Sequence, residues 1–192
     1  MGPTIGLNAR NFTKKHYSEQ VIKQYNESVL SWCKWVKAGV NCRVIFFPFC
    51  EAEHQNDLPM YNWLLSMLEP YNYYIEKYRF NKFSDLKWKI AQCDLFLGTR
   101  FHSALFAIQL GVPVLAVSYA NKSYKTMTEF GLRKYVLRVQ DVTFDILKKK
   151  WAMLCHDKKS LSEMYKTITQ EQNKLAMGYF DLIAQTVRSN SL

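Results

Sequence analysis

Four residues near the middle of this 192-residue chain have side chains suited to binding an anion and moving a proton: Gly98, Thr99, Arg100 and His102. They interrupt an otherwise apolar stretch, residues 94–119. Gly98 allows the backbone to approach a ligand closely, and Thr99 can cap a helix or hydrogen-bond an anion. Arg100 offers paired donors to a carboxylate or phosphate, and His102 can transfer a proton near neutral pH. The segment therefore indicates an anion site with an acid or base beside it.

A helix is expected to begin near Arg100, and its start favours an anion. The free N–H groups and partial positive charge of a helix N-terminus make an arginine unfavourable there unless an anion shares the position. That anion can be a ligand. It can equally be an acidic side chain of the protein, with His102 then a buried, hydrogen-bonded histidine. Both alternatives stay open, because an Arg-x-His pattern is short.

Two other basic residues, Arg10 and Lys122, follow predicted strands. In a parallel sheet the carboxyl ends of the strands meet along one edge, where ligands bind. We therefore expect Arg10, Lys122 and Arg100 to converge there and to suit a small anion with several charges. Considered one at a time, Arg10 and Lys122 are more simply solvated surface residues, so the prediction rests on the set.

An acidic loop, residues 51–57, follows the second predicted strand and contains Glu51, Glu53, His54 and Asp57. His54 and Asp57 are candidates for orienting a hydroxyl-bearing acceptor, for supporting the site or for acting as a general base. A solvated loop is the simpler alternative. The sequence contains no G-x-S-x-G, G-x-G-x-x-G or Walker A pattern that would indicate a competing site.

Short apolar runs alternate with helical patterns along the chain. Strands are predicted at 4–9, 42–49, 72–78, 95–97, 114–117 and 135–137. Helices are predicted at 18–39, 58–69, 84–93 with Ser84 as N-cap, 100–110 and 123–130, and two closing helices begin at Phe144 and Leu161. This alternation indicates an α/β fold: a Rossmann-like parallel sheet with helices on both faces and C-terminal helices, one domain over residues 1–192. We expect the polar last segment to pack on the outside or against a part that this sequence lacks.

Composition limits the remaining possibilities. Hydrophobic residues make up 48% of the chain, enough for a folded core. The net charge of +10 suggests a phosphorylated or polyanionic partner or an anionic membrane surface, but the basic residues are spread out, and nucleic-acid binding is not favoured. Five cysteines without a C-x-x-C pair, and four histidines without ligand spacing, indicate reduced thiols and no metal site. Without a signal-peptide pattern we expect a cytoplasmic protein, and peripheral association with the inner face of a membrane stays open.

Three short motifs occur in fixed order: Gly-Thr-Arg-Phe-His at 98–102, Gly-Val-Pro-Val at 111–114 and Tyr-Ala-Asn-Lys at 119–122. In this combination the sequence resembles the polysaccharide pyruvyl transferase family, in which a strand leads to G-x-R-F-H, a helix, G-x-P-V, a second strand and Y-x-x-K. A weaker likeness extends from Ile5 to about Leu137. The ordered set is much more specific than the Arg-x-His pair alone.

The resemblance implies a GT-B-like enzyme of two Rossmann-like domains that moves the pyruvyl group of phosphoenolpyruvate onto a sugar as a cyclic ketal, in cell-surface polysaccharide assembly. It implies that the anion-binding Arg-x-His pair of the family corresponds to Arg100 and His102, and we expect Gly98 and Thr99 to bind the donor beside them. Arg10 and Lys122 correspond less directly to donor-binding residues. His102 would be the acid that protonates the methylene carbon of the donor.

On this interpretation the chain is the C-terminal domain of a longer enzyme. Its partners would be phosphoenolpyruvate, a saccharide or lipid-linked saccharide acceptor, and an N-terminal domain that this sequence lacks; no cofactor is expected. Two alternatives stay open. One is half of a GT-B glycosyltransferase or sugar-nucleotide epimerase that binds a nucleotide-sugar, and the other is a noncatalytic anion-binding module.

Overall fold

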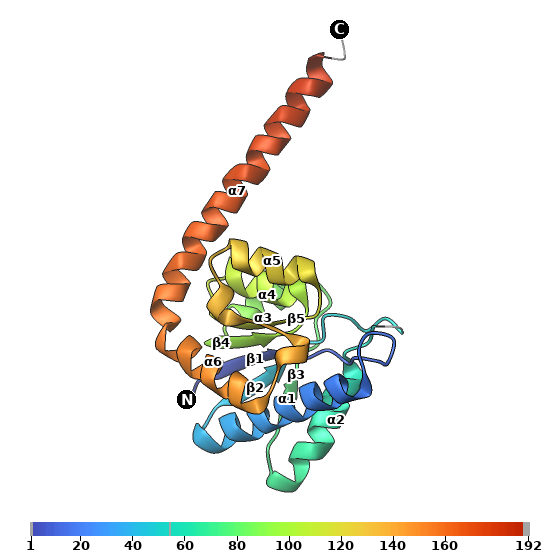
Figure 1. The fold of residues 1–192 in the computed structure, drawn as a ribbon. Helices are drawn as coiled ribbons and strands as arrows, with labels where there is room; N and C mark the ends of the chain where they lie inside the picture. The colour runs from blue at the N-terminus through green and yellow to red at the C-terminus, as the bar shows by residue number, and fades with distance from the viewer. Residues whose placement is uncertain (1, 54, 190–192) are drawn as a thin grey trace.

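The computed structural model describes residues 2–53 and 55–189, with the backbone alone for residues 181–189. A six-stranded parallel sheet lies at its centre, with the strand order β3-β2-β1-β4-β5-β6 (Figure 1). The strands are β1 (Thr4–Asn8), β2 (Arg43–Phe46), β3 (Glu76–Lys77), β4 (Leu95–Gly98), β5 (Val114–Ser118) and β6 (Val136–Arg138). The order reverses between β1 and β4, and in open α/β sheets ligands bind in the crevice at such a reversal.

Helices cover both faces of this sheet. They are α1 (Glu19–Gly39), α2 (Leu58–Leu68), α3 (Phe83–Ile90), α4 (Phe101–Gln109), α5 (Asn121–Glu129), α6 (Phe144–His156) and α7 (Lys158–Ser189), with short 3₁₀ helices η1 (Glu69–Tyr71), η2 (Arg133–Tyr135) and η3 (Val139–Asp141). In Figure 1, α1, α2 and α6 lie on one face of the sheet, and α3, α4 and α5 lie on the other. This is the predicted Rossmann-like fold.

The apolar runs that predicted the strands form the core. All residues of β4 and β5 are buried, as are all of β1 except Thr4 and all of β2 except Arg43. Such continuous burial is expected of strands covered on both faces. α1 buries an apolar stripe formed by Tyr25, Val29, Trp32, Cys33 and Val36. These elements fix the positions of the strand ends that carry the candidate site residues.

Two predicted boundaries near β3 are wrong: the start of this strand and the N-cap of α3, the helix that follows it. The strand predicted at 72–78 is only two residues long, because Asn72 takes a left-handed conformation (φ 56°) at the end of η1 and pairing with β2 begins later. Ser84 is not the N-cap of α3. Lys82 holds the extended N-cap conformation, and Ser84 lies in the first turn.

The last helix, α7, begins at Lys158 and not at the predicted Leu161, because Asp157 alone separates it from α6. Its first turns pack against the rest of the fold through Leu161, Tyr165 and Ile168, and it then extends away from the other elements (Figure 1). Residues 171–180 are all exposed. Within the described ranges, no helix combines the length and the apolar character needed to cross a bilayer.

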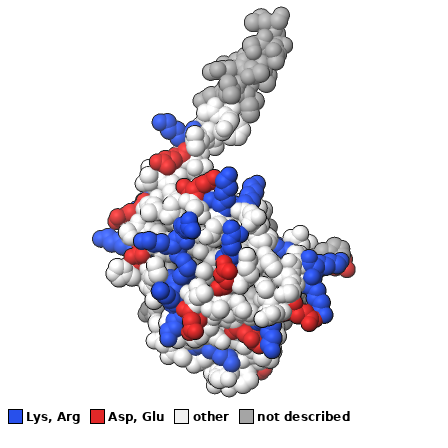
Figure 2. Space-filling model, viewed as in Figure 1, with Lys and Arg blue, Asp and Glu red and all other residues white. Residues whose placement is uncertain are grey.

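Basic side chains are scattered over the face shown in Figure 2, with Asp and Glu side chains between them. The charge excess therefore forms no single track for a long polyanion on this face. A local site built from a few charged groups fits this distribution better.

Candidate functional site

Asn8, the last residue of β1, connects the elements that meet at the crevice between β1 and β4. It is fully buried, and its Oδ1 accepts hydrogen bonds from the backbone N–H of Arg100 (2.9 Å) and the hydroxyl of Ser103 (3.1 Å). Its Nδ2 donates to the Phe47 carbonyl (2.9 Å) and to Asp57 Oδ2 (3.2 Å). One amide group therefore ties the ends of β1 and β2 to the acidic loop and to the start of α4.

Arg100 holds the N-cap position of α4 and is paired with Asp57. Its Nε lies 2.9 and 3.0 Å from the two carboxylate oxygens, and its Nη2 lies 2.7 Å from Oδ1. The exposed fraction is 9% for the Arg100 side chain and 0% for that of Asp57. Burial alone would lower the pKa of Arg100, but the hydrogen bonds and charge of Asp57 outweigh burial and raise that pKa. Two alternatives were open for the anion beside Arg100: a ligand or an acidic side chain of the protein. The structure shows an acidic side chain, that of Asp57.

The rest of the Arg100 guanidinium contacts Gln55, an exposed residue of the same loop. Nη2 donates to the Gln55 carbonyl, and Nη1 donates to Gln55 Oε1 at 3.3 Å. Asp57 stands at the N-cap of α2 without capping it by its side chain, and Asn56 Oδ1 accepts from the Leu58 N–H instead (2.8 Å). The carboxylate of Asp57 therefore binds Arg100 and does not cap α2. Nη1 of Arg100 has no charged partner among the described residues.

Gly98 and Thr99 lead from β4 into α4 under tight packing. A Cβ on Gly98 would lie 2.8 Å from Ser103 Oγ, so this position has no room for a side chain. The Thr99 hydroxyl does not cap α4; it is hydrogen-bonded to the Tyr25 hydroxyl (2.8 Å), which also accepts from the Arg10 N–H (3.2 Å). Burial raises the pKa of Tyr25, so its hydroxyl stays protonated and links Thr99 to Arg10.

Arg10 has no carboxylate partner in the described part of the chain. It is 4% exposed, and its guanidinium carbon lies over the ring of Tyr119 (4.3 Å to the centroid) and near that of Phe12 (5.4 Å). Its Nη2 lies 3.3 Å from His16 Nε2, while its Nε is buried without a hydrogen-bond partner. A buried charge is unfavourable unless it is paired. The surroundings of Arg10 are therefore suited to an added anion.

The structure pairs Arg100 with Asp57 at the start of α4, and the Tyr25 hydroxyl links the backbone of Arg10 to Thr99 just before that helix. His102 is exposed in the first turn of that helix, so the alternative of a buried histidine is wrong. Lys122 is exposed in the first turn of α5, which follows β5 on the same edge of the sheet. His54 lies outside the described residues.

Sequence reasoning did not assign a role to Asn8, Tyr25 or Tyr119. A signal existed for Asn8, since a buried amide at the end of an apolar strand needs partners for four hydrogen-bonding positions. Tyr25 belongs to the apolar stripe of α1 and has the same sequence pattern as core residues. Tyr119 opens the Tyr-Ala-Asn-Lys motif, but its stacking on Arg10 depends on the sheet order.

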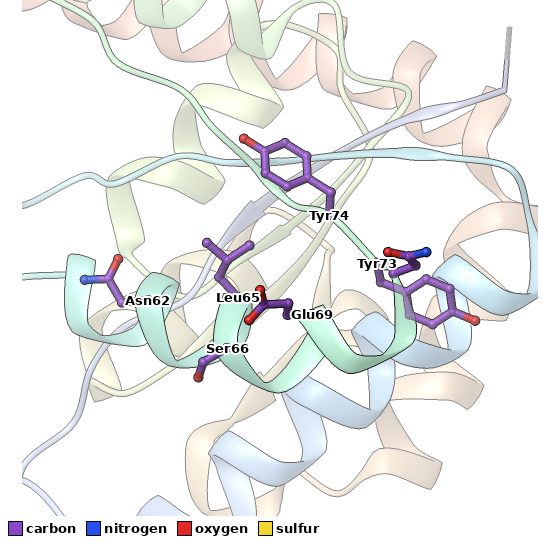
Figure 3. Close-up of a pocket in the computed structure, with 7 residues that line it drawn as sticks. Asn62, Leu65, Ser66, Glu69, Tyr73 and Tyr74 are labelled. Carbon is purple, nitrogen blue, oxygen red and sulfur yellow. The ribbon is translucent and has the colours of Figure 1, made fainter.

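A separate hollow of about 460 Å³ lies between α2 and the segment that leads to β3 (Figure 3). It is lined by Asn62, Leu65, Ser66, Glu69, Asn72, Tyr73 and Tyr74. This segment precedes β3 and so lies toward the amino ends of the strands, opposite the edge that carries Arg10. No group of three or more His, Cys, Asp or Glu residues that could hold a metal ion occurs within the described ranges.

Solved structures that resemble the fold include two that are described as enzymes of sugar chemistry. The glycotransferase of kitacinnamycin aligns with a TM-score of 0.54 and 14% identity over 95% of this chain and 43% of that chain. A protein described as UDP-N-acetylglucosamine 2-epimerase from Listeria monocytogenes aligns with a TM-score of 0.56 and 14% identity over 85% of this chain and 39% of that one. At this identity the likeness shows the fold alone, a Rossmann-like half of a GT-B architecture. This chain spans less than half the length of either structure.

Sequence comparison is more specific. The amylovoran biosynthesis protein AmsJ of Erwinia amylovora is 38% identical over 71 residues, which cover 35% of this chain and 17% of AmsJ. A family model described as polysaccharide pyruvyl transferase matches residues 12–121, more than half of the chain. The match includes the acidic loop with Asp57 and the segment from Gly98 to His102. The chain belongs to the polysaccharide pyruvyl transferase family.

Proposed function

We propose that this chain binds phosphoenolpyruvate and takes part in transferring its pyruvyl group to a saccharide as a cyclic ketal. The observation that carries the proposal is Arg10: its guanidinium is buried, and its Nε has no partner among the described residues. Membership of the family supports the reaction class. The unpaired cation at the ligand-binding edge supports an anionic donor.

Phosphoenolpyruvate suits these groups because it carries a carboxylate and a phosphate on the same enol carbon. Arg10 offers its Nε to one of them in surroundings with little water, where charge-assisted hydrogen bonds are strong. Arg100 offers Nη1, since Asp57 occupies its Nε and Nη2. The first N–H groups of α4, reached through the tight turn at Gly98, and the ammonium group of Lys122 add positive potential for the second anionic group.

In this proposal His102 is the acid, and its exposed position allows its proton to be replaced from solvent. The protonated imidazole gives its proton to the methylene carbon, whose new C–H bond takes the electron pair of the C=C bond. The central carbon becomes oxocarbenium-like, and a sugar hydroxyl attacks it and passes its proton to the imidazole. Phosphate then leaves with its C–O electron pair. A second hydroxyl of the same sugar attacks this carbon and gives its proton to phosphate, which closes the ketal without a cofactor.

Asp57, a candidate for acceptor binding or support, acts here as support, because it is fully buried against Arg100 and Asn8. His54 stays a candidate for acceptor binding. We also propose that a further domain supplies acceptor contacts, since this chain spans less than half of its structural neighbours. The five free cysteines suit the cytoplasmic location that we propose.

Calorimetric titration with phosphoenolpyruvate tests the donor assignment. We expect saturable binding, and Arg10→Gln should weaken it about 10- to 100-fold, the effect of losing hydrogen bonds to a charged group. Arg43→Gln is the matched control, because Arg43 pairs with Glu76 at the amino-terminal side of the sheet and its loss should leave the affinity unchanged. Tighter binding of UDP-N-acetylglucosamine than of phosphoenolpyruvate would support the nucleotide-sugar alternative and contradict the proposal.

The role of His102 needs a separate test in the full-length enzyme. His102→Ala should leave phosphoenolpyruvate binding nearly unchanged and abolish acceptor-dependent release of phosphate. If phosphate release continues at the wild-type rate, His102 is not the acid. If neither protein releases phosphate although both bind phosphoenolpyruvate, the noncatalytic anion-binding alternative is favoured.

A further inference from the structure

The outer face of α3 exposes two large aromatic side chains. Phe83 is 68% exposed and Trp88 is 65% exposed, whereas Leu86 and Ile90 of the same helix are buried against the fold. The buried pair is enough to hold α3 in place. The two aromatic side chains are therefore not needed by the core, and their exposure calls for a partner outside it.

The exposed aromatic surface continues from α3 onto α4. The Phe83 ring lies edge-on to that of Phe106 with centroids 6.3 Å apart, and Lys87 Nζ lies 5.3 Å from the Phe106 centroid. Phe83 and Lys87 are one turn apart and so share a side of α3, whereas Trp88, five residues after Phe83, lies on the adjacent outer side of the helix, away from the buried Leu86 and Ile90. We call the surface formed by Phe83, Lys87, Trp88 and Phe106 the α3 face.

The charge around the α3 face is positive. Lys82, Lys87 and Lys89 are set against a single acidic residue of the helix, Asp85. Aromatic side chains beside several lysines match the boundary of a bilayer with anionic lipids, where rings enter the headgroup layer and ammonium groups meet phosphates.

We propose that the α3 face binds the surface of a bilayer that contains anionic phospholipids. His102 lies one turn before Phe106 on α4, so binding through this face brings the exposed histidine close to the membrane. The saccharide acceptor would then be lipid-linked, with its hydroxyl groups presented along the bilayer. This last step rests on the proposed function, whereas lipid binding by the α3 face does not.

Sedimentation with phosphatidylglycerol–phosphatidylcholine vesicles tests the proposal. We expect binding to the mixed vesicles and little binding to phosphatidylcholine alone. The Lys82→Gln/Lys87→Gln variant should bind about 30-fold more weakly, because each lysine near an anionic surface contributes about 1 kcal/mol. Trp88→Ser should also release the protein, while Tyr179→Ser, which removes an aromatic side chain 70% exposed on α7, should not.

Tryptophan fluorescence supplies an independent readout. Trp88 is the most exposed of the five tryptophans, since Trp32 and Trp151 are buried and Trp35 and Trp63 are half-buried, so a blue shift on vesicle addition should come mainly from Trp88. Trp88→Phe should remove most of that shift and still sediment with vesicles. Three results would each overturn the proposal. The first is equal binding to neutral vesicles, and the second is loss of binding in Tyr179→Ser but not in Trp88→Ser. The third is a halved solution mass in Trp88→Ser, which would indicate that a second copy of the chain covers the α3 face.

Phosphoenolpyruvate titration of Trp88→Ser distinguishes this proposal from the proposed function. The substitution is on the surface and should leave the unfolding midpoint and the affinity for phosphoenolpyruvate unchanged. A variant that loses vesicle binding but keeps donor binding supports the α3 face. Vesicle binding in a wild-type chain that does not bind phosphoenolpyruvate would refute the donor assignment and leave the α3 face standing.

Discussion

Asp57→Asn should be strongly destabilising, because it leaves the charge of Arg100 buried without a counter-charge. The exposed fractions are 0% for Asp57 and 9% for Arg100, so water cannot replace the lost carboxylate. Removing one partner of such a buried pair costs about 3–5 kcal/mol. Since folded domains have a total stability of about 5–15 kcal/mol, the variant is expected to be marginally stable.

The new amide cannot restore the lost contacts. Asp57 Oδ2 also accepts from the N–H groups of Phe49 (3.0 Å) and Cys50 (3.3 Å), and from Asn8 Nδ2 (3.2 Å). An asparagine placed either way points its NH₂ group at donors, toward these N–H groups or toward the guanidinium of Arg100. The unsatisfied buried donors add to the lost charge, so we expect the upper half of the range.

Urea unfolding followed by far-UV circular dichroism measures this loss. The midpoint should fall sharply at a nearly unchanged slope, and exposed Asp141→Asn is the control that should stay within about 0.5 kcal/mol of the wild type. The double variant Asp57→Asn/Arg100→Met should be more stable than Asp57→Asn, because it removes the unpaired charge. A cost below about 1 kcal/mol, typical of an exposed ion pair, would refute the reasoning.

Three further predictions concern residues around the crevice and the start of the sheet. Gly98→Ala should cost about 1–3 kcal/mol of unfolding free energy through its clash with Ser103 Oγ at 2.8 Å, and Ser103→Ala in the same chain should recover part of that cost; strict additivity would contradict the clash. Asn8→Asp should lower the free energy of unfolding, measured by urea, by at least about 2 kcal/mol, because it replaces a buried donor with a second carboxylate. A near-neutral effect would show that the Asn8 amide does not hold Phe47 and Asp57 together. Hydrogen bonds from the Lys158 ammonium group and a backbone N–H lower the pKa of Asp94, so its contribution to stability is present above the ordinary value of 3.8 and is lost as pH falls through the lower folded value. Asp94→Asn should therefore destabilise at neutral pH and progressively less in acid, and a deficit that does not change with pH would contradict this origin.

The fold was largely predictable because its signals are local. Apolar runs long enough to be buried strands alternate with amphipathic helices, and a parallel sheet follows from that alternation. β3 was predicted too long since Asn72 leaves the extended region, and a backbone conformation of this kind is not encoded in an apolar pattern. The strand-to-helix turn at Gly98 was found because an apolar run is interrupted there by polar residues.

The hydrogen bonds and ion pairs of the candidate site were less predictable, because they join residues that are far apart in the chain. Helix electrostatics required an anion beside Arg100, but whether it was a ligand or Asp57 depended on how the acidic loop folds back. Arg10 was placed on the correct edge, yet nothing in the sequence showed that it would be buried against Tyr119 without a carboxylate. Charge alone predicted an anionic ligand, and the structure leaves Arg10, not Arg100, without a carboxylate partner among the described residues.

The central claim, that the unpaired Arg10 guanidinium holds an anionic donor, is tested most directly by nitrogen-15 NMR of the arginine Nε–H groups. Arg10→Lys assigns the Arg10 resonance by its disappearance. On addition of phosphoenolpyruvate the Arg10 Nε–H signal should shift strongly and exchange more slowly with water, because it gains the hydrogen-bond partner that it lacks. Saturating phosphoenolpyruvate that leaves this signal unchanged would contradict the account.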